Sequence, residues 1–302
     1  MRFVTAEKDN RTFIGVTNEQ LSYVLDLTLA DKTKHQTAQL PATMIECIEL
    51  GEQFLSLASS LEQWIIENPD QNKFKYQIDD IKLLAPIPRP TKNVFCIGKN
   101  YKDHVLEMGS EADLPSDPIV FTKPPTAVIG NEDIILNHKQ VTDELDYEGE
   151  LAVIIGKKGT NITKKQALDY VFGYTIINDI TARDLQKKHK QFFIGKSLDS
   201  SCPMGPVIVH KTEINNPNHL NLQTKVNGEI RQKANTELFI FDVETIISII
   251  SKGHTLEPGD IIATGTPAGV GKGFKPPRLL QPGDQIEIWV EGIGVLRNTV
   301  EH

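Results

Sequence analysis

The sequence predicts a mixed α+β fold, predominantly β, with a barrel or roll preceded by a small α+β domain. After residue 86, apolar segments of strand length recur between Gly, Pro, Asn and Asp turns, and helical patterns are few. This succession of short strands with few helices argues against a doubly wound α/β fold. Before residue 67 lies one long apolar stripe with helical spacing, and the proline-rich segment 86–90 separates the two parts. We therefore predict domains of residues 1–86 and 87–302.

The first domain is predicted to combine short strands with one interrupted helix. Residues 2–6, 12–16 and 21–27 are apolar segments between polar turns, which predicts three strands. From residue 41 to 67, apolar side chains recur at three- and four-residue steps, which predicts a helix interrupted at Gly51. Such a stripe is typical of core packing, and this domain carries no motif with catalytic potential.

The second domain is predicted to consist mainly of strands. Asn227-Gly228 predicts a hairpin between residues 222–226 and 229–232. Helices are expected at residues 99–108, 164–170, 182–189 and 243–251. Further strands are expected at residues 93–98, 119–122, 151–156, 174–179, 207–210 and 261–264.

Composition narrows the class of protein. A chain of 302 residues with 39% hydrophobic and 24% charged residues is typical of a folded globular protein. Its net charge of −8 and the absence of a basic stripe argue against nucleic-acid binding. The first residues do not form a signal peptide, and no apolar run approaches the roughly 20 residues that span a bilayer, so we expect a cytoplasmic protein. Cys47, Cys96 and Cys202 are too widely spaced for a cysteine-based zinc site.

Glu148 and Glu150 begin an apolar run that predicts a buried strand. Alternate side chains of a strand share a face, so the two carboxylates are expected to be close and to repel each other unless a cation or shared proton lies between them. Asp179 ends another apolar run. Three carboxylates without a nearby His or Cys favour an oxygen-only site for Mg²⁺ or Mn²⁺. The alternative is a solvated strand face with Asp179 as a helix cap, and spacing alone leaves both open.

His104 and Glu107 stand three residues apart on the expected helix 99–108, so their side chains are predicted to be neighbours. A carboxylate beside an imidazole fixes its orientation, and such a pair can take a proton from water or substrate. The alternative is that His104 is a core histidine packed with Tyr101 and Met108. Asn100 is expected to cap the helix.

Further candidates follow strand ends or lie in turns. Arg183 and Gln186 share a helix face just after the second apolar run and are placed to bind a carboxylate. Lys123 precedes two prolines and Lys196 stands in Gly-Lys-Ser; for each, the alternative is an ordinary surface charge. Residues 263–273 are rich in glycine but lack the Walker pattern, so a loop whose backbone approaches a small ligand is the better interpretation.

Together these segments resemble the fumarylacetoacetate hydrolase superfamily. The motifs are Tyr-x-x-His-x-x-Glu, Glu-x-Glu, Asn-Asp-x-Thr-Ala-Arg-Asp, Gly-Lys-Ser and Thr-Gly-Thr-Pro, between about residues 92 and 300. The resemblance looks closest to the bacterial acylpyruvate hydrolase and oxaloacetate decarboxylase/tautomerase branch. It implies a fumarylacetoacetate hydrolase-like β-roll with barrel-like closure in the catalytic domain, usually assembled as a homodimer.

The resemblance also implies a role for each motif. The metal ligands for Mg²⁺ or Mn²⁺ would be Glu148, Glu150 and Asp179. Catalysis would involve His104 as the base, Glu107 to orient it, and Lys196 as positive charge near the reacting group. The substrate site would be lined by Lys123, Arg183, Gln186, Gly265 and Thr266. Residues 109–118 have the composition of a mobile lid.

The implied function is that of a metal-dependent enzyme, a C–C bond hydrolase or lyase, that acts on a 2-oxo acid through an enolate. Oxaloacetate decarboxylation, oxaloacetate tautomerisation and acylpyruvate hydrolysis share that enolate, and the motifs leave the choice open. Two alternatives remain: an isomerase or decarboxylase of unsaturated dioic acids in aromatic catabolism, and a non-catalytic metabolite-sensing protein. No nucleic-acid or membrane partner is expected.

Overall fold

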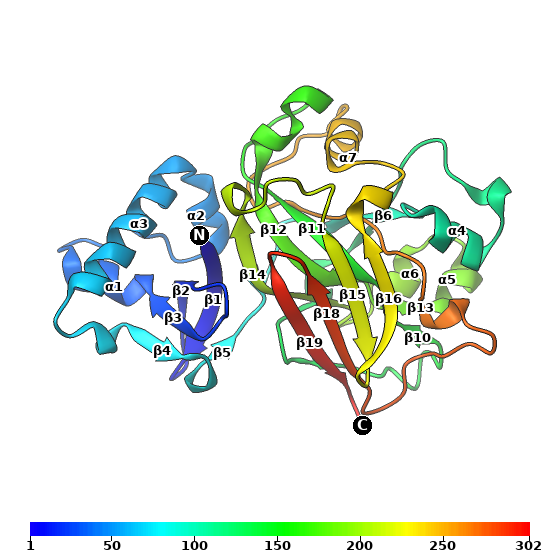
Figure 1. The fold of residues 1–302 in the computed structure, drawn as a ribbon, viewed down its shortest axis with the longest axis horizontal. Helices are drawn as coiled ribbons and strands as arrows, with labels where there is room; N and C mark the ends of the chain where they lie inside the picture. The colour runs from blue at the N-terminus through cyan, green and yellow to red at the C-terminus, as the bar shows by residue number, and fades with distance from the viewer.

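The computed structural model describes residues 1–302 apart from the side chain of Gln71, and its main feature is a 12-stranded sheet that runs through both parts of the chain (Figure 1). Its order is β4-β3-β2-β1-β14-β12-β11-β17-β6-β7, with β5 paired to β1 and β8 to β14. These strands are β1 (Arg2–Lys8), β2 (Arg11–Thr17), β3 (Tyr23–Asp26), β4 (Lys75–Gln77), β5 (Lys82–Leu83), β6 (Val94–Gly98), β7 (Ile119–Lys123), β8 (Val128–Ile129), β11 (Gly149–Ile155), β12 (Val171–Asn178), β14 (Cys202–His210) and β17 (Ile261–Ala263).

Two smaller sheets complete the β structure. A five-stranded sheet has the order β16-β15-β18-β19-β9, and β10 pairs with β13 alone. Their strands are β9 (Ile134–Ile135), β10 (Leu145–Asp146), β13 (Thr181–Ala182), β15 (Asn221–Val226), β16 (Glu229–Asn235), β18 (Gln285–Val290) and β19 (Gly294–Val300). The predicted hairpin is confirmed as β15–β16, with Asn227 and Gly228 both at positive φ as its turn requires. The predominance of strands confirms the predicted fold class.

The helices lie mainly on the outside of the sheets. They are α1 (Leu27–Lys34), α2 (Met44–Glu49), α3 (Glu52–Glu67), α4 (Lys102–Met108), α5 (Arg183–His189), α6 (Phe193–Lys196) and α7 (Val243–Ile250). A capping box between Thr43 and Glu46 begins α2, and Gly51 at φ 56° separates α2 from α3, as the sequence predicts. Short 3₁₀ segments lie at η1 (Gln71–Lys73), η2 (Ile78–Asp80), η3 (Glu111–Asp113), η4 (Pro125–Ala127), η5 (Lys164–Tyr170), η6 (Lys211–Glu213), η7 (Thr236–Leu238) and η8 (Gly271–Gly273).

The expected strand at residues 21–27 is wrong at its end. It ends at Asp26, whose side chain accepts a hydrogen bond from the amide of Leu29 and begins α1, a helix that was not predicted. The helix expected at residues 164–170 is present as a 3₁₀ helix.

The chain's first part packs tightly against the rest. The ring of Phe54 on α3 lies 4.7 Å from that of Phe3 on β1 and 6.2 Å from that of Phe172 on β12, centroid to centroid. Backbone pairing also crosses between the parts, because β1 joins β14 through Arg2↔Val209 and Phe3↔Ile208. The division at residue 86 stays a prediction.

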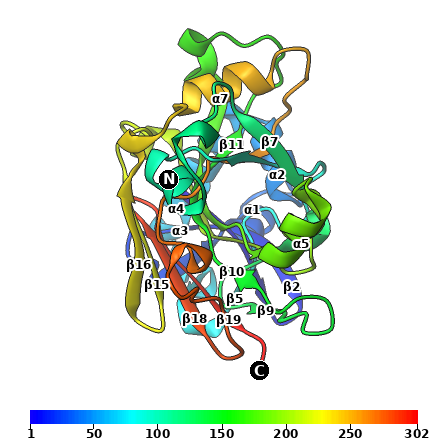
Figure 2. The same ribbon diagram turned by 90° about the vertical axis from the view of Figure 1, so that its right-hand side faces the viewer.

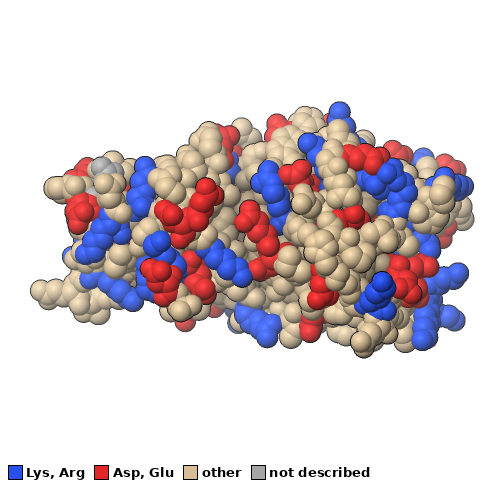
Figure 3. Space-filling view, turned by 90° about the horizontal axis from the view of Figure 1, so that it is seen from below, with Lys and Arg blue, Asp and Glu red and all other residues tan. Residues whose placement is uncertain are grey.

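The helices that carry His104 and Arg183 lie at one end of the molecule (Figure 1). Figures 1 and 2 show α4 and α5 at the end of the molecule away from α1 and α3. Acidic and basic side chains are interspersed over the face in Figure 3, which shows no broad area of one sign. Within the part of the chain that the structure describes, no helix has the length and apolar character needed to traverse a bilayer.

Candidate active site

The three predicted acids meet where two strands pair. Glu148 immediately precedes β11, Glu150 lies on it, and Asp179 immediately follows β12. β11 and β12 are antiparallel, with Gly149 opposite Asn178, and the amide of Asp179 donates to the carbonyl of Glu148 at 2.8 Å. Carboxylate oxygens of the three acids lie within 4.8 Å of one another, and all three side chains are buried. A solvated strand face is therefore excluded.

Buried cations surround two of these acids. Nζ of Lys196, at the end of α6, lies 2.7 Å from both Oε2 of Glu148 and Oδ2 of Asp179. Nζ of Lys123, at the end of β7, lies 2.7 Å from Oδ1 of Asp179. The side chains of both lysines are at most 3% exposed, so neither is an ordinary surface charge. Nη1 of Arg183, the first residue of α5, lies 2.8 Å from Oε1 of Glu148.

Glu150 differs from the other two acids because no basic side chain pairs with it among the described residues. Its Oε2 accepts the amide of Gly265 at 2.8 Å. Burial raises the pKa of Glu150 well above its usual value, and the neighbouring Asp179 and Glu148 raise it further. Burial also opposes ionisation of Glu148, but Lys196 and Arg183 lower its pKa to about 2. The site therefore has one carboxylate whose negative charge lacks compensation.

His104 and Glu107 form a hydrogen-bonded pair on α4. Nδ1 of His104 lies 2.8 Å from Oε1 of Glu107. A carboxylate only accepts, so Nδ1 donates and Nε2 is the nitrogen left to exchange a proton. His104 is 8% exposed and lines the cavity described below, which argues against a core histidine that only packs. Asn100 does not cap α4; its side chain instead bonds the carbonyls of Thr264 and Phe241.

A cavity of about 480 Å³ opens beside these groups. The predicted residues that line it are Glu148, Glu150, His104, Lys196, Arg183, Gln186 and Thr266. Of the others, Asp179, Glu107 and Gly265 bond lining residues, whereas Lys123 bonds only Asp179 and the carbonyl of Ile180 and does not line the cavity. Nη2 of Arg183 is buried without a hydrogen-bond partner among the described residues, and it is therefore available to an anionic ligand.

The cavity also has features that sequence reasoning missed. Its outer wall carries four further lysines and an aromatic ring: Lys99, Lys187, Lys190, Lys272 and Phe192. Behind it, Gln232 of β16 donates to Oγ1 of Thr266 at 2.7 Å and accepts the amide of Gly149 at 3.0 Å. Asp146, at the end of β10, bonds Arg183 through Nε at 2.8 Å. No local pattern marks Gln232, whereas Asp146 extends the alternation of Glu148 and Glu150 by one step.

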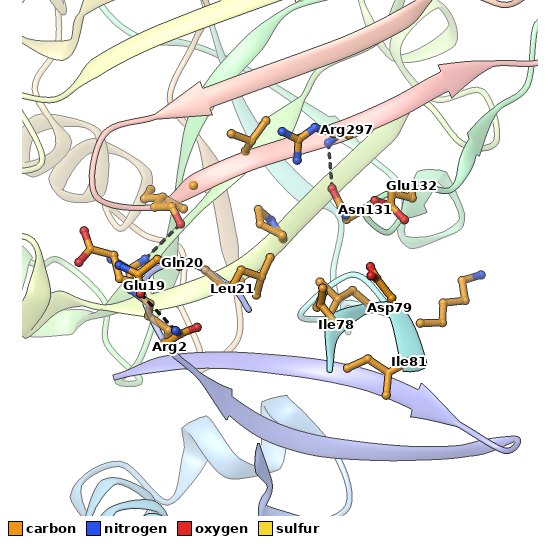
Figure 4. A pocket seen from close by; sticks show the side chains of 18 of the residues that line it. Arg2, Glu19, Gln20, Leu21, Ile78, Asp79, Ile81, Asn131, Glu132 and Arg297 are labelled. Carbon is orange, nitrogen blue, oxygen red and sulfur yellow. Dashed lines mark hydrogen bonds between the residues drawn. The ribbon is translucent and has the colours of Figure 1, made fainter. Parts of the chain in front are cut away.

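A larger cavity, of about 840 Å³, shares no lining residue with the first (Figure 4). It separates the β1 and β2 region, with Arg2 and Leu21, from β19, with Arg297. None of the predicted site residues lines it. Lys82, which also lines it, is paired with Asp133 at 2.8 Å, and the guanidinium of Arg2 bonds backbone carbonyls.

Comparisons with known proteins identify the family of the chain. The model for the fumarylacetoacetate (FAA) hydrolase C-terminal region matches residues 93–301. The chain is 54% identical over 301 residues to oxaloacetate tautomerase YisK of Bacillus subtilis, covering 99% of this chain and 100% of the relative. A solved fumarylacetoacetate hydrolase from Exiguobacterium antarcticum has a TM-score of 0.82 and 44% identity, covering 100% of this chain and 99% of that one. The 2-hydroxyhepta-2,4-diene-1,7-dioate isomerase from Mycobacterium marinum has a TM-score of 0.73 and 32% identity, covering 100% and 98%. The chain belongs to the fumarylacetoacetate hydrolase family and is an enzyme of that superfamily.

Proposed function

We propose that the chain is a Mg²⁺- or Mn²⁺-dependent enzyme that converts a 2-oxo acid through an enolate, with oxaloacetate tautomerisation as the leading reaction. The observation that carries this proposal is the buried acid cluster, in which Glu150 lies beside two carboxylates without a basic partner among the described residues. Three carboxylates suit a hard divalent cation that prefers oxygen ligands. The full-length relative with 54% identity, an oxaloacetate tautomerase by name, supports the choice of reaction.

The residues present fit a divalent cation. Glu148, Glu150 and Asp179 would hold it, and all three side chains are buried, so water competes little for them. When bound, the cation would polarise the 2-oxo group and stabilise the negative charge of the enolate.

The chain's own groups would bind the substrate and move the proton. Arg183 offers its unpartnered Nη2 to a substrate carboxylate, with Gln186 on the same face of α5 at 3.4 Å from Nη1. Lys196 adds positive charge around the enolate oxygen. Nε2 of His104 takes the C3 proton, and Glu107 holds the ring in the orientation required. For tautomerisation, His104 would return that proton to the 2-oxo oxygen to give the enol, and no C–C bond breaks; decarboxylation of oxaloacetate or hydrolysis of an acylpyruvate would instead break the C3–C4 bond.

The experiment compares the wild type with Glu148→Gln. We expect the variant to lose both Mn²⁺ binding, measured by calorimetry, and turnover of oxaloacetate, measured by the absorbance of its enol. A fully active Glu148→Gln variant would refute the proposal.

A second candidate is isomerisation or decarboxylation of unsaturated dioic acids. The similarity to the M. marinum isomerase favours it. Parallel assays on oxaloacetate, acetylpyruvate and such a dienoate separate the candidates by kcat/KM. We further propose a cytoplasmic homodimer, which light scattering during gel filtration and cell fractionation would test.

A further inference from the structure

Asp146 lies outside the acid cluster but is bonded to both halves of the site. Its side chain is fully buried and accepts four hydrogen bonds. The donors are the amide of Tyr147 at 3.0 Å, the amide of Gly271 at 2.7 Å, the amide of Lys272 at 2.9 Å and Nε of Arg183 at 2.8 Å. Because every partner is a donor, only an acceptor with two oxygens satisfies them all.

One branch of these bonds leads to the acid cluster. Arg183 uses Nε for Asp146 and Nη1 for Oε1 of Glu148 at 2.8 Å. The carboxylate of Asp146 therefore fixes the plane of the Arg183 guanidinium. The orientation of this plane determines how strongly Arg183 competes with a metal cation for the carboxylate of Glu148. Without Asp146, Arg183 would be free to turn wholly toward Glu148.

The other branch leads to the His104–Glu107 pair through residues 269–273, which we call the glycine loop. Asp146 holds the loop at Gly271, and the hydroxyl of Tyr147 donates to the carbonyl of Gly269 at 2.8 Å. The amide of Gly269 in turn donates to Oε2 of Glu107 at 2.9 Å, while Oε1 of Glu107 accepts from His104. The loop thus holds the carboxylate that orients the base.

Gly269 of this loop requires glycine, and the absence of a side chain at Gly273 leaves room for the carboxylate of Glu107. Gly269 has φ 103°, and a Cβ there would overlap the carbonyl of Arg231. A Cβ on Gly273 would overlap Oε2 of Glu107. The loop backbone therefore approaches Glu107 closely and fixes the position of its carboxylate.

We propose that Asp146 is a positioning residue that keeps the His104–Glu107 pair and the Arg183–Glu148 pair in one mutual geometry. Disturbing either branch displaces groups that must face the same substrate, and a displacement of about 1 Å lowers turnover by about 100-fold. This inference rests on the proposed function for its kinetic readout, but its structural readout is independent of any substrate.

The test is Asp146→Asn, which keeps the shape and turns one acceptor into a donor facing other donors. We expect kcat to fall by about 10- to 100-fold, and the Kd for Mn²⁺, measured by electron paramagnetic resonance on EDTA-treated protein, to rise several-fold because Arg183 competes for Glu148. Hydrogen exchange should rise both in the glycine loop and in α4. Asp184→Asn on α5, whose carboxylate bonds Thr142, is the matched control and should change none of these.

Gly273→Ala separates the two branches, since it displaces Glu107 and leaves Asp146 in place. It should lower kcat without changing the Mn²⁺ Kd, and its effect on kcat should be less than additive with that of Asp146→Asn. An Asp146→Asn protein that loses only thermal stability, with unchanged exchange in α4 and unchanged Mn²⁺ Kd, overturns the proposal.

The proposal can still be tested if Asp146→Asn misfolds or if the wild type does not convert a 2-oxo acid. If Asp146→Asn does not fold, Gly271→Ala, whose Cβ would lie 2.5 Å from the carbonyl oxygen of Arg278 and 2.6 Å from Oδ1 of Asp146, displaces the loop from Asp146 and tests the loop branch by exchange in α4. If the wild type converts no 2-oxo acid, the proposed function fails, while the exchange experiment still decides whether Asp146 couples the loop to α4.

Discussion

Replacing Glu150 by glutamine should stabilise the cation-free protein and abolish its stabilisation by Mg²⁺ or Mn²⁺. Glu150 is 1% exposed, and carboxylate oxygens of Glu148 and Asp179 lie within 4.8 Å of its own. Two unit charges at that distance repel by about 3 kcal/mol at an effective dielectric constant of about 20. Lys196, which lies between the other two acids, offsets part of this repulsion. A net gain of about 1–3 kcal/mol is left for the neutral amide.

The pH dependence gives the sign of the effect. The pKa of Glu150 is raised above 4.5 in the folded state, so above pH 4.5 the folded chain retains a proton that the unfolded chain has lost. Unfolding then releases a proton, and the free energy of unfolding falls as the pH rises toward the folded-state pKa. Glutamine removes this slope, so the advantage of the variant should grow with pH over that window.

Thermal melting in EDTA and in excess Mn²⁺ measures both effects. In EDTA, Glu150→Gln should melt about 2–6 °C above the wild type, because each kcal/mol corresponds to about 2 °C in a chain of this size. In Mn²⁺, the wild type should gain stability and the variant should not. The matched variant Glu148→Gln should have the opposite sign in EDTA, with a loss of about 1.5–3 kcal/mol, because it removes one of the two carboxylates that Lys196 and Arg183 each contact. The reasoning fails if both variants shift the melting temperature in the same direction, or if Glu150→Gln retains the Mn²⁺ response.

Three further outcomes are expected. His104→Asn should lower kcat by about 10²- to 10⁴-fold with an unchanged calorimetric Kd for Mn²⁺; an unchanged kcat would exclude His104 as the base. Lys187→Ala, on the cavity's outer wall, should raise KM for a dianionic 2-oxo acid at low ionic strength, and the effect should vanish near 1 M salt, where charges are screened within about 3 Å. A salt-independent change would point to direct contact instead. Phe54→Ala should cost about 3–5 kcal/mol in denaturant unfolding, since its ring packs on Phe3 and Phe172; a loss below 1 kcal/mol would contradict that packing.

The sequence predicts the long elements of the fold because their periodicity is local. The stripe from 41 to 67 contains its own break at Gly51, and the Asn227-Gly228 turn fixes a hairpin without help from distant residues. Among the strands that were not predicted, β8, β9, β10 and β13 have only two residues each, and pairing with a partner far along the chain creates them, whereas β19 was missed in spite of its seven residues. Helix α1 was missed altogether because an apolar run continues across Asp26, the residue that caps the helix.

The candidate site also contains some residues whose position the sequence predicts and others whose position it does not. Glu148 and Glu150 could be found because strand alternation places them on one side, and His104 and Glu107 because helical spacing makes them neighbours. The burial of Lys123 and Lys196 could not be foreseen, since a lysine is solvated unless tertiary packing brings carboxylates to it. The support of Thr266 by Gln232 depends on β16 meeting the loop that follows β17, and no sequence spacing indicates this contact.

Because β1 pairs with β14, residues 1–86 cover part of the surface of the remaining chain. Removal of these residues would leave β14 with an unpaired edge at Ile208 and Val209. It would also expose Phe172 and Ile208, which are now buried. Exposed edges with apolar faces pair with other chains. A fragment beginning at residue 87 should therefore aggregate on expression even though it contains every proposed catalytic group. Solubility, more than chemistry, would then require the first part of the chain to remain attached.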